Sequence, residues 1–112
     1  MSESTMEQVQ RVAKLYGLRT SSVPTEPPKL RDLMDRCFEL GYPEPDIQTG
    51  DGKTEGGVVV PMVQVQLHSN QKGKRNVVAH CQIPVSSDVK LAHRIAVRSA
   101  FAEALLLAET QG

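Results

Sequence analysis

Apolar residues recur every three or four positions in three parts of the chain, and each part is predicted to be a helix. The first helix spans residues 5–16, with Thr5 placed to cap it and Gly17 placed to end it. Its apolar residues are Met6, Val9, Val12, Ala13 and Tyr16. This apolar face is short, so we expect the helix to be marginal in water unless it docks on the rest of the chain.

The second helix is expected to begin near Pro28 and to end at Gly41, which is soon followed by further prolines. Its apolar residues are Leu30, Leu33, Met34, Cys37 and Phe38. Residues 19–28 hold three prolines and a Ser/Thr cluster, a composition typical of a stiff linker. We therefore assign residues 1–26 to an N-terminal helical appendage with its linker, and residues 27–109 to the domain proper.

Alternating apolar and polar residues predict three strands between the second and third helices. A short strand is expected at residues 47–49, followed by a glycine-rich loop at residues 50–57. The clearest alternation, at residues 58–67, predicts a half-buried second strand. A third strand is predicted at residues 77–83, where it would lie at an edge of the sheet with backbone groups free to join a partner's sheet.

The last helix is expected to follow Ser86 or Ser87, either of which can cap it. Ala92, Ala96 and Ala100 form a stripe of small side chains, which lets a helix lie close on a sheet. The predicted order is helix, three antiparallel strands and helix, with a short extra helix ahead. The fold class is therefore α+β, with a three-stranded antiparallel sheet packed on two helices.

Beyond Ala100 the last helix is apolar over most of its circumference, with Glu103 as the main break. Such a helix must be covered on nearly every side. Two covers are available: the helix at residues 5–16 folds back onto it, or a second chain, identical or different, supplies the surface. The candidate interface residues are Phe101, Leu105, Leu106, Val9, Val12 and Tyr16.

The composition is that of a small globular protein without an overall affinity for polyanions. The chain has 112 residues, 39% of them hydrophobic, and 13 basic residues balance 13 acidic ones. No apolar run approaches the length that spans a bilayer, so we expect no membrane association. Cys37 and Cys81 are far apart in sequence and are expected to be reduced, buried thiols of an intracellular protein.

The sequence offers no catalytic motif, and we expect no enzyme activity, cofactor, metal site or small-molecule substrate. His80 and Cys81 are neighbours, but adjacent side chains on a strand point to opposite faces of the sheet. They are therefore poorly placed as a base and a nucleophile. The glycine-rich loop at residues 50–57 lacks the spacing of a phosphate-binding loop.

Three stretches, in this order, resemble the double-stranded RNA-binding domain (dsRBD) family over roughly residues 27–107. These are PPKLRDLMDRCFELGYPEPDI, PMVQVQL and KLAHRIAVRSAF. The second has Val63 where the family usually has Phe, and the third keeps Lys90, Ala92 and Ala96 of the family's pattern. The resemblance implies an α-β-β-β-α fold and contact with duplex RNA.

The same resemblance shows departures at the positions that contact RNA in the family. Of the lysine run that opens the last helix, only Lys90 is retained, because Val89 and His93 stand at the other positions. The loop between strands one and two has no His, and Asp35 stands where the first helix of the domain usually has Glu. With fewer phosphate contacts and no net charge, duplex binding through this face is expected to be weak or absent.

A local basic patch remains, and it gives the alternative to this expectation. Lys90, Arg94 and Arg98 share one face of the last helix because they are spaced four residues apart. Lys72, Lys74 and Arg75 cluster in the loop between strands two and three. The candidate RNA-contacting residues are Lys90, Arg94, Arg98, Lys72, Lys74, Arg75 and Asp35.

Three functions are compatible with these patterns. The first is a dsRBD-like adaptor that forms homo- or heterodimers within an RNA-processing or RNA-silencing assembly, as the loss of RNA contacts and the surplus of apolar helix surface indicate. The second is a double-stranded RNA-binding module that uses the residual basic patch. The third is a small scaffold or regulator without a connection to RNA.

Overall fold

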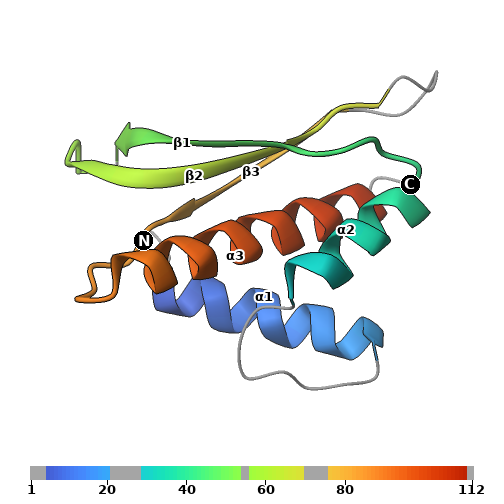
Figure 1. Ribbon diagram of the computed structural model, residues 1–112, viewed down its shortest axis with the longest axis horizontal. Coiled ribbons are helices and arrows are strands. Elements are labelled where there is room, and N and C mark those ends of the chain that lie inside the picture. The colour runs from blue at the N-terminus through green and yellow to red at the C-terminus, as the bar shows by residue number, and fades with distance from the viewer. Residues whose placement is uncertain (1–4, 21–28, 54–55, 70–75, 111–112) are drawn as a thin grey trace.

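The computed structural model describes residues 5–20, 29–53, 56–69 and 76–110, and in the first of these segments it describes the side chains of residues 6–15. Its elements are α1 (Thr5–Thr20), α2 (Leu30–Glu39), β1 (Asp46–Lys53), β2 (Val59–Leu67), β3 (Val77–Gln82) and α3 (Val89–Thr110). This order confirms the predicted α+β class. Figure 1 shows α3 between the sheet and α1, with α2 beside the C-terminal half of α3. No helix in the described part of the chain is long and apolar enough to span a bilayer.

The sheet is antiparallel, with the strand order β1-β2-β3. β3 therefore lies at an edge, as predicted. β1 is longer than predicted, because residues 50–53 belong to the strand and pair with residues 59–62 of β2. The prediction ended this strand too early because it assigned the glycine-rich residues to a loop. A Cβ atom at Gly52 would lie 2.5 Å from Sδ of Met62, so the glycine makes room for a neighbouring side chain within the sheet.

One face of the sheet is apolar and the other carries mostly polar side chains. Val65 pairs with Ala79, and both are buried on the face toward α3. Gln64 pairs with His80 on the opposite face, where the amide oxygen of Gln64 lies 3.1 Å from Nε2 of His80. The buried residues of β2 and β3 are Val63, Val65, Leu67, Val77, Ala79 and Cys81. The period of two predicted for these strands is confirmed.

α3 lies on the sheet through its alanines. Ala92, Ala96 and Ala100 are buried, and α3 packs on β2 and β3. All three alanines of the predicted stripe are thus buried, and Ala96 and Ala100 belong to the same apolar cluster as the strand residues. The cap of α3 differs from the prediction, since Oδ1 of Asp88 accepts a hydrogen bond of 3.0 Å from the backbone N–H of Leu91. Ser86 instead accepts a bond from the N–H of Asp88 and so orients the capping residue.

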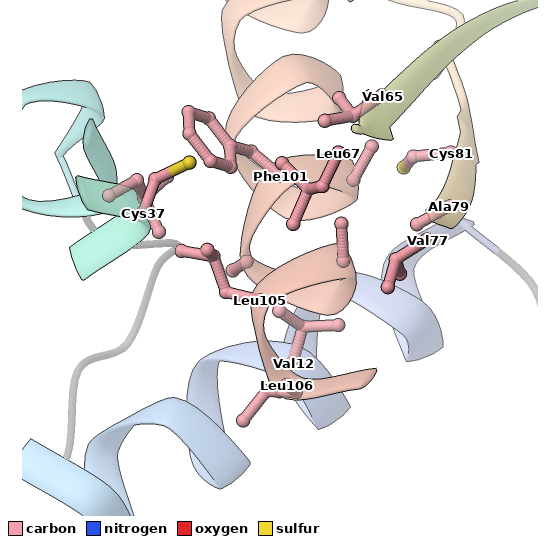
Figure 2. Packing of buried hydrophobic residues seen from close by; sticks show 14 of the residues in the cluster. Val12, Cys37, Val65, Leu67, Val77, Ala79, Cys81, Phe101, Leu105 and Leu106 are labelled. Atoms are coloured by element: carbon pink, nitrogen blue, oxygen red, sulfur yellow. The ribbon is translucent and has the colours of Figure 1, made fainter. Parts of the chain in front are cut away.

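α2 packs on the C-terminal half of α3. Leu33 and Cys37 of α2 are fully buried, and Figure 2 shows Cys37 facing Phe101 and Leu105 of α3. The predicted stop at Gly41 is confirmed, because Gly41 has a φ of 87°. The following N–H, of Tyr42, donates to the carbonyl of Cys37 at 3.2 Å and closes the helix end.

α1 is part of the packed core. Val9, Val12 and Ala13 are buried against α3 and β3, and Val12 belongs to the same apolar cluster as the sheet residues. The predicted boundary near residue 27 therefore does not divide this core. Gly17 does not end the helix as predicted, since α1 continues to Thr20. A single glycine weakens a helix without terminating it when no left-handed turn follows.

Both cysteines are free and buried, as predicted. They lie on opposite sides of α3, with Cys37 on α2 and Cys81 on β3 (Figure 2). Burial raises the pKa of the Cys37 thiol. The thiol donates a weak 3.5 Å hydrogen bond to the carbonyl of Pro43. Both residues therefore act as small apolar side chains of the core.

Ser99 gives a test of the packing around α3. Ser99 is fully buried, and its hydroxyl has no hydrogen-bond partner among the described residues. Burying an unbonded hydroxyl is unfavourable, and alanine is also the better helix former. We expect Ser99→Ala to raise the free energy of unfolding by about 1 kcal/mol in urea denaturation.

The matched control for this variant is Ala100→Ser, which places a hydroxyl at the next position of the same helix. Ala100 is also fully buried, so the added hydroxyl should lower the free energy of unfolding. A loss of stability in Ser99→Ala would instead indicate that this hydroxyl makes a stabilising hydrogen bond.

Candidate functional site

The predicted basic stripe of α3 lies on the part of the helix that the other elements leave open. Lys90 and Arg94 are exposed, and Arg98 is half-buried. The sheet, α1 and α2 cover the other sides of α3, but α2 lies beside its C-terminal half only (Figure 1). The stripe is thus an accessible row of cations on the first turns of the helix.

The same side of α3 changes from charged to apolar where α2 begins to cover it. Continuing from Arg98 by steps of three and four residues leads to Phe101 and Leu105, which are fully buried and lie near Cys37 of α2 (Figure 2). Arg98 stands at the transition, so its stem is partly covered. The length of α3 that α2 covers therefore determines how many of these cations are exposed to solvent.

A side-chain contact ties the open half of α3 to β1. Nε2 of His93 lies 2.9 Å from Oγ1 of Thr49. Thr49 pairs with the buried Val63, so its side chain projects from the face of β1 that is turned toward α3. This contact fixes the first turns of α3, and hence Lys90 and Arg94, relative to the sheet.

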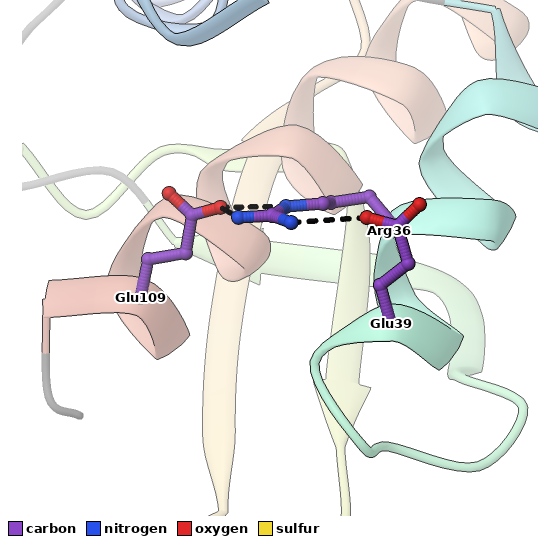
Figure 3. A network of polar contacts seen from close by, with 3 residues as sticks. All are labelled: Arg36, Glu39 and Glu109. Atoms are coloured by element: carbon purple, nitrogen blue, oxygen red, sulfur yellow. Dashed lines mark hydrogen bonds and ion pairs between the residues drawn. The ribbon is translucent and has the colours of Figure 1, made fainter.

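An ion-pair cluster fixes α2 against the C-terminal end of α3 (Figure 3). Nε and Nη2 of Arg36 donate to Oε1 of Glu109 at 2.8 Å and 2.5 Å, and Nη1 donates to Glu39 at 3.0 Å. These hydrogen bonds, that of Glu109 first, raise the pKa of Arg36. The guanidinium group of Arg36 thus binds one carboxylate on its own helix and one on α3, which fixes the position of α2 along α3.

The other candidate RNA-contacting residues are separate from this stripe or lie outside the described structure. Asp35 is exposed on α2, as a contact residue must be. Residues 70–75, which include Lys72, Lys74 and Arg75, lie outside the described residues. The described part of the site is therefore the α3 stripe with the exposed side of α2 next to it.

The candidate interface residues lie inside the molecule instead of on its surface. Phe101 and Leu105 are fully buried, so neither can anchor a second chain while α1 and α2 stay docked. Leu106 is also buried and lies close to Val12 of α1 (Figure 2). Of the two covers that the sequence allowed, the structure has the fold-back of α1, through Val9 and Val12. The side chain of Tyr16 lies outside the described residues.

Polar contacts on α1 that the sequence analysis did not identify hold this helix in place. Gln8 and Arg11 both donate to the carboxylate of Glu103 on α3, each at 2.5 Å. Gln8 also lies 2.6 Å from the backbone oxygen of His80, so it occupies a polar group of the β3 edge. The sequence singled out Glu103 as the break in the apolar surface of α3. No sequence pattern pointed to its partners, which lie more than 90 residues away.

No constellation typical of catalysis is found in the described part of the chain. His80 is exposed on the outer face of the sheet, and Cys81 is buried on the inner face, as expected from strand geometry. Among the described residues, no group of three or more His, Cys, Asp and Glu side chains could hold a metal ion. In comparisons with protein-family models, curated proteins and solved structures, the chain matches none of them.

The contacts of Arg36 predict that its two glutamate partners contribute unequally to the stability of the fold. The Glu109 side chain is 8% exposed and that of Glu39 is 63% exposed. Because water screens the half-exposed guanidinium, we expect Glu109→Gln to lower the free energy of unfolding by about 1 kcal/mol only. Glu39→Gln, which alters the same arginine's exposed partner, should change it by less than about 0.5 kcal/mol.

Urea denaturation of both variants at low and high salt measures this difference. The loss in Glu109→Gln should decrease only in part at high salt, because the Glu109 carboxylate is buried whereas the Arg36 guanidinium is half-exposed. Equal effects of the two substitutions would contradict the assignment of Glu109 as the contact that fixes α2.

Proposed function

We propose that this chain is a non-catalytic, dsRBD-like module that contacts duplex RNA through the α3 stripe of Lys90, Arg94 and Arg98. The observation that carries the proposal is the exposure of Lys90 and Arg94 on a side of α3 left open by α1 and α2. Duplex RNA is recognised through its phosphates and 2′-hydroxyl groups, and a row of cations on a rigid helix suits that target. The order α2-β1-β2-β3-α3 is the order that the resemblance implies, and α1 is an additional helix ahead of it.

The binding that follows from these residues is modest and sensitive to salt. Two or three phosphate contacts release few counterions, and the chain has no net charge to attract RNA from a distance. The exposed carboxylate of Asp35 repels a phosphate placed beside α2. We therefore assign the module to a supporting role in RNA binding, within an RNA-processing or RNA-silencing assembly.

The adaptor function remains a second candidate, but with a different interface from the predicted one. Phe101 and Leu105 motivated it, and they are buried. The observation that still favours it is that, among the α1 side chains that the structure describes (residues 6–15), the buried apolar ones are the small residues Val9, Val12 and Ala13. A helix that docks through small apolar side chains is an element that a partner can displace.

The stripe is tested by a titration of the full chain with a fluorescent RNA duplex, read as anisotropy at two salt concentrations. Removing Lys90 and Arg94 together should weaken binding about tenfold or more and make the salt dependence shallower by about two phosphate contacts. The reason is that each of these side chains is expected to neutralise one phosphate.

The control is Lys14→Ala, which removes an exposed lysine of α1 that is not on the stripe. It should leave both the affinity and the salt dependence unchanged. Equal losses in the control and in the Lys90→Ala/Arg94→Ala variant would show that binding reflects overall charge and would overturn the proposed site. A chain that shows no duplex binding at low salt would overturn the function itself.

A further inference from the structure

The sheet has two edges, and the rest of the molecule covers them differently. At the β3 edge, α1 packs beside the strand, and the amide of Gln8 donates to the backbone oxygen of His80 at 2.6 Å. β1 forms the other edge, and among the described elements it packs chiefly on β2 (Figure 1). Within the described structure, the side of β1 that faces away from β2 therefore presents backbone N–H and C=O groups for pairing with another strand.

The end of β1 carries two opposite charges on one face of the strand. Asp51 and Lys53 are exposed, and they project to the same face as Thr49, which contacts His93 of α3. Both charges lie past this contact. Neither side chain forms an ion pair or a hydrogen bond within the part of the chain that the structure describes. Charged side chains at a sheet edge discourage pairing with strands that do not match them.

A second copy of β1 matches this pattern of charges. In a two-fold antiparallel pair, the residue on the axis lies opposite itself, and its two neighbours lie opposite each other. With the axis at Gly52, Asp51 of each copy lies opposite Lys53 of the other, on the same face of the joined sheet. An axis at residue 51 or 53 instead places two carboxylates or two ammonium groups opposite each other, which is unfavourable. The charges therefore favour the axis at Gly52.

The centre of this pair suits the close approach of two backbones. Gly52 has no side chain, and the side chain of Met62 lies over it, since a Cβ atom there would lie 2.5 Å from Sδ of Met62. On the other face, Val59 pairs with Lys53 and is 59% exposed. Apolar side chains thus flank the centre on both faces, and their contact would add to the backbone hydrogen bonds of the pair.

The same end of the β1–β2 hairpin extends beyond the third strand. Residues 50–53 of β1 pair with residues 59–62 of β2, whereas β3 pairs with residues 62–67 of β2. Most of this end is therefore a ladder of two strands, which is weakly stable by itself. A strand added along β1 gives it the third strand that β3 does not supply.

We propose that two copies of this chain associate through their β1 edges, antiparallel and with the two-fold axis at Gly52. The two three-stranded sheets then form one continuous sheet. The paired segment is short, so the dimer is weak and forms at high protein concentration. The dimer uses neither the α3 stripe nor the surface under α1, and it does not rest on RNA binding.

Charge reversal at the two positions tests the pairing with full-length chains. Both side chains are exposed, so the substitutions leave the core intact. In a homodimer of Asp51→Lys all the facing side chains are ammonium groups, and in a homodimer of Lys53→Asp they are all carboxylates. We expect each variant alone to associate about tenfold more weakly than the wild type at low salt. A mixture of the two variants, in which every ammonium group faces a carboxylate, should associate as the wild type does.

Sedimentation velocity over a series of concentrations measures the association. The double variant Asp51→Lys/Lys53→Asp restores both pairs and should behave as the wild type. Lys14→Glu is the matched control, because it changes the net charge as much as Lys53→Asp does, at an exposed position of α1. It should leave the association unchanged. Urea denaturation of the single variants should give the stability of the wild type, so that weaker association reflects the interface and not the fold.

Three results would overturn the proposal. One is a wild type that stays monomeric up to about 1 mM. Another is association of each variant alone to the extent of the wild type, which would place the interface elsewhere. The third is an equal loss in Lys14→Glu, which would show an effect of net charge. The measurement contains no RNA, so a failure of the proposed RNA binding has no influence on any of these results.

Discussion

The fold depends on the close approach of α3 to the sheet. Ala92, Ala96 and Ala100 have no side-chain atoms beyond Cβ, so the backbone of α3 lies near β2 and β3. This close packing excludes water from both surfaces. A larger side chain in this stripe would push the helix away from the whole sheet. The other contacts of α3 follow from this one, because a helix fixed on the sheet presents other parts of its surface to α1 and α2.

The sequence was sufficient for what depends on local chemistry. Helical spacing, strand alternation and the stop at Gly41 predicted the type and order of every element, and the alanine stripe predicted which side of α3 meets the sheet. It was insufficient where a tertiary contact overrides a local preference. Gly52 lies in β1, where the absence of a Cβ atom leaves room for the side chain of Met62 on the paired strand.

The candidate site shows the same division. The spacing of Lys90, Arg94 and Arg98 predicted a shared stripe, and the structure places these residues on one side of α3. Their exposure depends on how far α2 reaches along α3, which the Arg36–Glu109 pair sets across 73 positions of the sequence. For the same reason, no pattern within α3 could tell whether Phe101 and Leu105 face a partner or this chain's own helices.

The start of α3 limits the strength of any phosphate contact there. A helix N-terminus has free N–H groups and a positive dipole end, and both attract anions. In this chain Asp88 accepts from the N–H of Leu91 and places its own carboxylate at that end, so the favourable site for an anion is already filled. A phosphate must then bind along the side of the helix, where Lys90 and Arg94 project, without help from the dipole. Under the proposed function, the residue that stabilises the helix start is therefore one reason to expect only modest binding of duplexes.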